Sequence, residues 1–359
     1  MTNVTWYSVR EKPFSIYGLY QPLEPGIFRR LPEDVAEKTS ENVWMLSTNT
    51  SGGRIRFQTD SQTIHLKAIY SSKKLATPRA AALSTTGAFC FDLYADGEFA
   101  GIFIPDKIEE CNPFTHFFIE DNTIESVISL KSRKIRKMRD IIIHMPCFAD
   151  ILEVYIGVEE HAEVRKGKVY GNEKPIVFYG SSITQGACVS RPGNMYQNIL
   201  SQKLNFDYVN LGFSGSALAE DSIIDYISQM DMQMLVFDYD HNAPTPEYLE
   251  KTHYKALEKI RSVQKDIPIF ILTRPNLSGG VEEVEIRRNI IYKSYETLCS
   301  NGDQNVYFVD GRKAFHSLNK NMMTIDGIHP NDFGFYCIAA QLEAAMRREG
   351  NDRNKNERE

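Results

Sequence analysis

Two short segments in the second half of the chain hold residue types that could carry out nucleophilic catalysis. Ser182 lies in the sequence GSSITQG, directly after the apolar run 175–179, and Asp326 and His329 stand three residues apart in the sequence DGIHP. A serine hydroxyl is a weak nucleophile at neutral pH until a positioned base takes its proton. A histidine can be that base, and a carboxylate can orient the imidazole. The order Ser, Asp, His therefore predicts a serine esterase or acyltransferase.

Each segment taken alone also has a structural interpretation. Ser182 could simply cap the helix expected after it, because serine is a common N-cap residue. The Asp326 to His329 segment could be an ordinary polar loop with a surface histidine, in which Gly327 permits a tight turn. If Ser182 does stand at a helix N-terminus, that position also favours negative charge and suits catalysis. The catalytic interpretation therefore depends on elements that bring the two segments together.

The second half of the sequence alternates strand and helix patterns. The predicted strands are 176–179, 208–211, 234–237, 267–272 and 306–309, and the predicted helices are 194–204, 222–230, 246–264, 283–300 and 334–348. Such alternation predicts a parallel sheet covered by helices on both faces. Sites in these sheets form at the carboxyl ends of the strands. Ser182, Gly215 and Asn242 each follow a predicted strand, so they could converge at that edge.

The first half is instead rich in short β patterns. Runs with strand character occupy 53–58, 63–69, 89–94, 140–144 and 151–156. Asp96–Gly97 is a hairpin signal after the third of these runs. Many short strands with few helical periods predict a β-sandwich of the jelly-roll type.

The length of the chain suggests two domains, and its composition is that of an ordinary globular protein. The chain has 359 residues, 42% hydrophobic and 25% charged, and a net charge of −6, which argues against general nucleic-acid binding. The basic run 131–139 is expected to be a solvated strand edge or hairpin rather than a nucleic-acid site.

Six scattered cysteines and the spacing of the histidines indicate no metal site and no disulfide framework. There is no signal-like or membrane-spanning apolar run, so a cytoplasmic location is expected.

Four blocks together resemble the SGNH (GDSL-type) hydrolase superfamily over roughly residues 172–346. Besides the Ser182 and His329 blocks, these are the sequences NLGFSGS at 210–216 and DYDHN at 238–242. The resemblance implies a three-layer α/β/α, flavodoxin-like catalytic domain at 172–349. The charged composition of 350–359 predicts a disordered tail. Segment 87–94, which contains Asp92-Leu-Tyr, resembles the β-sandwich that precedes the catalytic domain in some bacterial carbohydrate esterases. That implies a carbohydrate-binding-like domain at 1–165.

The resemblance also implies roles at the site. Ser182 would be the nucleophile, His329 the base and Asp326 its orienting carboxylate. The backbone N–H groups of Ser182 and Gly215 and the side-chain amide of Asn242 would form the oxyanion hole. The chain departs from the superfamily pattern at two places. Ser181 stands where the superfamily usually has aspartate, and the usual G-x-N-D block is here Asp-His-Asn-Ala, without its glycine and its last aspartate.

Three further polar residues near these blocks have more than one interpretation. Arg191 could bind a substrate carboxylate or sugar hydroxyls, or it could brace its loop. His241 is expected to line the pocket as a substrate-binding neighbour rather than to act as a second base. Asp238, at the end of an apolar strand, could support the Asn242 loop or be exposed.

The sequence thus predicts a cofactor-independent serine esterase. The resemblance to carbohydrate esterases implies a short acyl ester as substrate, expected to be an acetyl group on a carbohydrate. The expected partner is a small-molecule or oligosaccharide ester, with no nucleic acid, membrane or metal involved. An acyltransferase would use the same triad with an alcohol in place of water. A third possibility is a non-catalytic protein whose sandwich binds a glycan, against which the intact Ser, Asp and His argue. The oligomeric state stays open.

Overall fold

The fold comes from a computed structural model that describes most of the chain. The described residues are 3–71, 74–75, 83–104, 108–112, 116–119, 122–130, 136–275, 281–315 and 322–356. The chain divides into two compact units. The β unit consists of Met1–Asp34, Trp44–Gly171 and Gly186–Gly193, and the α/β unit consists of Val35–Val43, Asn172–Gln185 and Asn194–Glu359.

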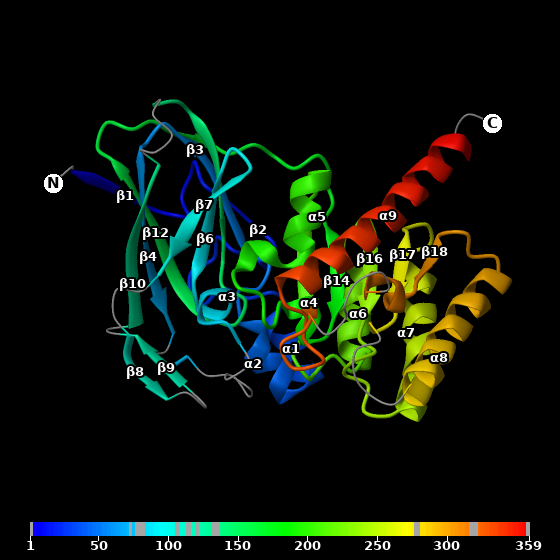
Figure 1. The fold of residues 1–359 in the computed structure, drawn as a ribbon. Coiled ribbons are helices and arrows are strands. Elements are labelled where there is room, and N and C mark those ends of the chain that lie inside the picture. Colours follow the sequence, from blue (N-terminus) through cyan, green and yellow to red (C-terminus); the bar gives the residue numbers. More distant parts are fainter. Residues whose placement is uncertain are drawn as a thin grey trace. The chain divides into compact units, whose positions relative to one another are not determined.

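The β unit is an antiparallel β-sandwich, which confirms the prediction for the first half (Figure 1). One sheet has the order β1 (Val4–Ser8), β12 (Ile151–Glu159), β4 (Thr63–Tyr70), β10 (Thr123–Ser129). The second has the order β13 (Val164–Lys166), β3 (Arg54–Thr59), β11 (Arg139–His144), β6 (Phe91–Ala95), β7 (Glu98–Phe103), with β2 (Ser15–Tyr17) paired to β3. A small third sheet has the order β5 (Lys74–Leu75), β9 (His116–Ile119), β8 (Ile108–Asn112). The first half of the sequence also holds the short helices α1 (Glu33–Thr39), α2 (Glu41–Ser47) and α3 (Thr85–Phe89). Most of α1 and the start of α2 belong to the α/β unit, and α3 belongs to the β unit.

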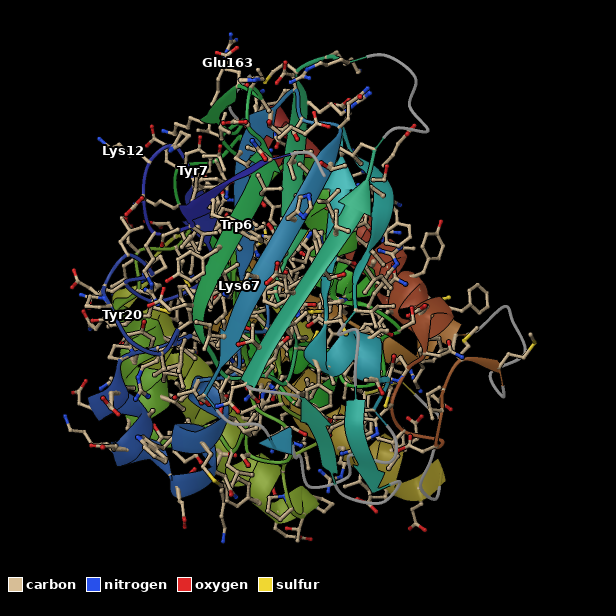
Figure 2. The ribbon with its side chains drawn as sticks, turned by 90° about the vertical axis from the view of Figure 1, so that its left-hand side faces the viewer. Trp6, Tyr7, Lys12, Tyr20, Lys67 and Glu163 are labelled. Carbon is tan, nitrogen blue, oxygen red and sulfur yellow. The ribbon has the colours of Figure 1, made fainter. Side chains whose placement is uncertain are left out.

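Local sequence explains the strands of this unit. Along β4 the buried positions alternate with half-exposed ones, so Ile64 and Leu66 enter the core while His65 and Lys67 face outward. Figure 2 views the outer side of this sheet and labels Lys67 there. Between β6 and β7 the turn residues Asp96 and Gly97 have φ of 55° and 82°. Two successive positive φ values define the hairpin turn that the Asp-Gly pair predicted.

The α/β unit is built on a five-stranded sheet in which every neighbouring pair is parallel. Its strand order is β15 (Tyr208–Gly212), β14 (Ile176–Gly180), β16 (Met234–Asp238), β17 (Ile269–Leu272), β18 (Val306–Val309). The helices are α4 (Ser182–Gln185), α5 (Tyr196–Leu204), α6 (Asp221–Gln229), α7 (Pro246–Val263), α8 (Val281–Ser300) and α9 (Asp332–Asn356). Helices α6, α7 and α8 pack side by side, and α5 packs on α9 (Figure 1). The sheet with its flanking helices forms the three layers that were predicted.

The register of the central strands brings three loops to one edge of this sheet. Gly180 at the end of β14 is paired with Gly212 of β15 on one side and with Asp238 of β16 on the other. The loops that carry Ser182, Gly215 and Asn242 therefore begin at the same level, at the carboxyl ends of adjacent strands.

Some details at the ends of elements differ from the predictions. Strand β17 begins at Ile269 rather than 267, next to Pro268, which has no N–H to donate to a ladder. Helix α9 continues to Asn356, so most of the tail predicted to be disordered is helical, and its last residues, 357–359, lie outside the described part. Within 350–356 only Arg353 and Lys355 are good helix formers, so helix propensity does not explain this extension.

The basic run 131–139 is described only from residue 136. Arg136 pairs with Asp60, while Lys137 and Arg139 both pair with Asp96, so these three cations contact acidic side chains of the sandwich. Within the described ranges, no helix is long and apolar enough to cross a bilayer.

Candidate active site

The loop after β14 places Ser182 at the first residue of helix α4. Gly180 makes the sharp entry possible, because a Cβ there would lie 2.2 Å from Thr184 Oγ1 and 2.3 Å from the carbonyl oxygen of Asp238. Ser181 rather than Ser182 performs the capping role, since its hydroxyl accepts a hydrogen bond from the backbone N–H of Ile183 at 3.2 Å. The Ser182 hydroxyl is therefore left for another partner.

That partner is His329. Ser182 Oγ lies 2.9 Å from His329 Nε2, and His329 Nδ1 lies 2.7 Å from Asp326 Oδ2. Both Ser182 and His329 are buried, with 7% and 5% of their surface exposed. The three residues thus form one continuous hydrogen-bonded chain, the arrangement that allows a serine to be deprotonated as it attacks.

The loop that carries Asp326 and His329 is closed on itself. The backbone N–H of Ile325 donates to the carbonyl oxygen of His329 at 3.0 Å, and Gly327 has a φ of 84° that favours glycine. The other carboxylate oxygen of Asp326 accepts the N–H groups of Ile328 and His329 at 3.0 and 2.8 Å. Burial alone would raise the pKa of Asp326, but these hydrogen bonds and the His329 ring outweigh it and hold the pKa at about 2. The carboxylate is charged at any pH at which the enzyme would work.

Candidate oxyanion donors come from two neighbouring loops and from the nucleophile. Gly215 has a φ of 70° and faces open space. Among the described residues, no acceptor takes the backbone N–H of Ser182 or Gly215, or the side-chain amide N–H of Asn242. The Asn242 amide is oriented, because its oxygen accepts the N–H of Ala217 at 3.2 Å. Its Nδ2 is thereby left as a free donor.

The Asn242 loop is held by a buried ion cluster that the sequence analysis did not predict. Arg274 donates its backbone N–H to Asp240 Oδ2 at 3.0 Å and its guanidinium to the Asp240 carbonyl at 2.8 Å. Arg287, only 3% exposed on α8, donates to the carbonyl oxygens of Asp240 and Ala243 at 3.3 and 3.1 Å. The two arginines therefore fix both ends of the loop. A signal was present in the sequence, since Arg287 interrupts an apolar helix stripe between Val284 and Ile291.

His241 and Asp238 complete the surroundings of this loop. Burial lowers the pKa of His241 to about 3, with Arg274 and His329 acting in the same direction, so the ring is neutral near pH 7. Its Nε2 is buried without a hydrogen-bond partner in the described structure. Asp238 is buried too, so the alternative of an exposed side chain is wrong. Burial, together with Asp240, raises the pKa of Asp238 well above its usual range.

Arg191 belongs to the β unit, where it contacts other residues of that unit. Its guanidinium donates to Asp92 Oδ2 at 3.0 Å and to the hydroxyl of Tyr94. It also lies 4.1 Å from the ring centre of Phe99. Asp92 additionally accepts the backbone N–H of Gly193 at 2.8 Å. These contacts brace the Arg191 segment within the β unit, and the predicted role of Arg191 in substrate binding stays a prediction.

The geometry defines a serine acyl hydrolase on a parallel α/β sheet. In agreement, residues 173–347 match the GDSL-like lipase/acylhydrolase family, and residues 4–164 match the GxDLY domain, described as the N-terminus of SGNH-hydrolase-type esterases. The protein is therefore an esterase whose residues 173–347 form a domain of the GDSL-like lipase/acylhydrolase family, preceded by a GxDLY domain, as the sequence resemblance predicted.

Solved structures with similar folds cover almost the whole chain. A protein from Bacteroides ovatus ATCC 8483 described as a GDSL-like lipase is 26% identical with a TM-score of 0.82, over 96% of this chain and 98% of that one. The salicylyl-acyltransferase SsfX3 of a tetracycline biosynthetic pathway is 18% identical with a TM-score of 0.73, over 97% and 98%. A family two carbohydrate esterase from Clostridium thermocellum, solved with cellohexaose, is 15% identical with a TM-score of 0.57, over 84% and 93%. A search of curated proteins gave no match.

Proposed function

We propose that this esterase removes short acyl groups, acetyl in particular, from a carbohydrate through an acyl-enzyme on Ser182. The observation that carries the chemistry is the unbroken chain from Ser182 through His329 to Asp326, with spacings of 2.9 and 2.7 Å. The carbohydrate class is supported by the likeness in fold to the carbohydrate esterases. That likeness is a likeness of fold, so the substrate must be tested directly.

The mechanism that we propose has two steps. Ser182 Oγ attacks the ester carbonyl while His329 Nε2 takes its proton, and Asp326 stabilises the imidazolium that forms. The N–H groups of Ser182 and Gly215 and the amide of Asn242 would donate to the oxyanion. His329 then protonates the leaving alcohol, and a water activated by the same ring releases the acid and restores the serine. These steps need no cofactor.

An acyltransferase is the second candidate, because the same intermediate can be consumed by an alcohol. The fold shared with SsfX3, over nearly the full length of both chains, supports this second candidate. The two functions differ only in the acceptor of the acyl group. Adding an acceptor alcohol or amine to the assay separates them, since a transferase would yield acylated acceptor rather than free acid.

The test measures hydrolysis of p-nitrophenyl acetate, butyrate and octanoate, followed by acetate release from acetylated xylo-oligosaccharides. Ser182→Ala should abolish turnover, whereas the neighbouring Ser181→Ala should keep most of it, because that variant loses only the cap hydrogen bond with Ile183. Asn242→Ala should lower kcat by about 10²- to 10³-fold, the usual cost of one oxyanion donor. Turnover that survives Ser182→Ala would refute the nucleophile, and a preference for octanoate would refute the short-acyl assignment.

A further inference from the structure

The outer face of one sheet of the β unit carries a hollow of about 320 Å³. The residues that line it come from all four strands, and they are Trp6 of β1, Tyr155 of β12, Lys67 and Ile69 of β4, and Glu125 of β10. Figure 2 looks onto this face and labels Trp6 and Lys67, which lie on different strands of the sheet. We call it the Trp6 groove.

Strand register arranges the polar members of the groove in one row. Tyr155 is directly opposite Lys67, and Lys67 is directly opposite Glu125. Directly opposite residues on one face of a sheet have Cβ atoms about 5 Å apart, so the hydroxyl, the ammonium and the carboxylate follow one another across three strands. The row is as wide as one sugar unit or more, because adjacent strands are about 4.8 Å apart.

Trp6 forms a wall beside this row. It is paired with Gly157 of β12, and a Cβ on that glycine would lie 3.1 Å from Trp6 Cδ2, so the indole packs on the bare backbone of the next strand. His65 meets the indole edge-on at 6.1 Å between ring centres. Trp6 has 38% of its surface exposed, so it is accessible from solvent.

In the described part of the protein, the polar groups of the groove have only electrostatic neighbours, since Glu125 acts on His65 and Tyr155 on Arg10. Among the residues that the structure describes, no hydrogen bond or ion pair involves the Trp6 indole N–H, the Tyr155 hydroxyl, the Lys67 ammonium or the Glu125 carboxylate. Lys67 and Glu125 face each other across neighbouring strands without forming a salt bridge. One cation and one anion also leave the groove without net charge.

We propose that the Trp6 groove binds a neutral oligosaccharide. A pyranose ring has an apolar C–H face that packs on an aromatic ring, and its neighbouring hydroxyls can accept from Lys67 while donating to Glu125. A nucleic acid fits poorly, because phosphate binding needs several cations and Glu125 would repel it. A protein partner fits poorly too, since Lys and Glu are depleted from the cores of protein interfaces. The groove shares no residue with the triad, so this proposal does not rest on the esterase function.

Tryptophan fluorescence offers a direct test, because Trp6 and Trp44 are the two tryptophans of the chain and both are 38% exposed. Full-length Trp44→Phe protein would be titrated with cellohexaose and with xylohexaose, neither of which carries an ester. We expect a saturable change in Trp6 emission with at least one probe. By calorimetry on the full-length chain, Trp6→Ala should weaken binding of that sugar at least tenfold, and Lys67→Met and Glu125→Gln by about three- to tenfold each. The matched control Trp44→Ala should leave the affinity unchanged.

Three outcomes would overturn the proposal. The first is that neither hexasaccharide binds the wild-type chain at millimolar concentration. The second is that binding survives Trp6→Ala at full affinity, which would place the sugar elsewhere, including at the triad. The third is that Trp44→Ala weakens binding as much as Trp6→Ala does. Because the readout is binding of sugars without an ester, a failure of the proposed esterase activity would leave these results unaffected.

Discussion

Each unit of this protein contains an aspartate–histidine pair of the same geometry. In the α/β unit, Asp326 Oδ2 lies 2.7 Å from His329 Nδ1, and in the β unit, Asp92 Oδ1 lies 2.7 Å from His144 Nδ1. The two pairs differ in everything around that hydrogen bond. The comparison therefore separates the pair that we propose to be catalytic from one with a structural role.

The first difference is the other ring nitrogen. His329 Nε2 contacts the Ser182 hydroxyl, whereas among the described residues no hydrogen bond reaches His144 Nε2, and the His144 ring packs edge-on against Tyr94. The second difference is exposure. The side chain of Asp326 is 34% exposed, and that of Asp92 is 0% exposed.

The third difference is which groups donate hydrogen bonds to the second carboxylate oxygen of each aspartate. Asp326 uses it to shape its own loop, while Asp92 uses it to bind Arg191 and the N–H of Gly193. Asp92 therefore fastens the segment Gly186–Gly193, which the chain enters just after helix α4, to the sandwich. An Asp–His distance alone therefore does not distinguish the two pairs. The hydroxyl of Ser182 beside the far nitrogen of His329 does, and it is the basis of the proposed catalytic role.

Exchanging each histidine for glutamine should give the largest difference in activity between variants of the two pairs. Glutamine can still donate a hydrogen bond to the aspartate, but it cannot take a proton from serine. His329→Gln should lower kcat on p-nitrophenyl acetate by about 10⁵- to 10⁶-fold. His144→Gln, its matched control, should stay within about tenfold of the wild type. Equal losses in the two variants, measured on protein shown to be folded by circular dichroism, would refute the distinction.

Exchanging each aspartate for asparagine should separate activity from stability. Asp326→Asn should lower kcat by about 10³- to 10⁴-fold, because the imidazole loses its orientation and the stabilisation of its charge. Its free energy of unfolding should change by no more than about 1 kcal/mol, given its exposure. Asp92→Asn should cost about 3 kcal/mol of stability, since it leaves the half-buried Arg191 guanidinium without its carboxylate.

Urea unfolding and steady-state kinetics on the same preparations would test this crossover. Each variant serves as the control for the other. A loss of activity in Asp92→Asn comparable to that in Asp326→Asn, with stability retained, would show that the buried pair takes part in the chemistry.

Local patterns explain which parts of this structure the sequence could predict. The strands were predictable because alternation along β4 is a property of adjacent residues, and the triad because Ser182 and the Asp326–His329 pair lie in contiguous motifs. The hydrogen-bond partners of Asp92 and of the Asp240 carbonyl were not predictable, because they lie far away in the sequence. Asp92 and His144 are 52 residues apart, and Arg287 lies 47 residues from the Asp240 carbonyl that it holds. Only the packing of strands and helices brings such residues together.

The smallest effect expected concerns pH, and it would sharpen the description of Asp326. Its pKa falls from 3.8 to about 2 on folding, despite the opposing effect of burial. A lowered folded-state pKa means that the charged carboxylate stabilises the fold above about pH 4, and that this contribution is lost as the pH falls through about 2. Because the side chain is partly exposed, we expect a contribution of only about 1 kcal/mol after solvent screening. The measurement is the difference in unfolding free energy between wild type and Asp326→Asn, at pH 6 and at pH 2. The wild type should lose its advantage at pH 2, since asparagine does not titrate. A difference that stays constant between the two pH values would show that the carboxylate gains no stabilisation from its hydrogen bonds with Ile328 and His329.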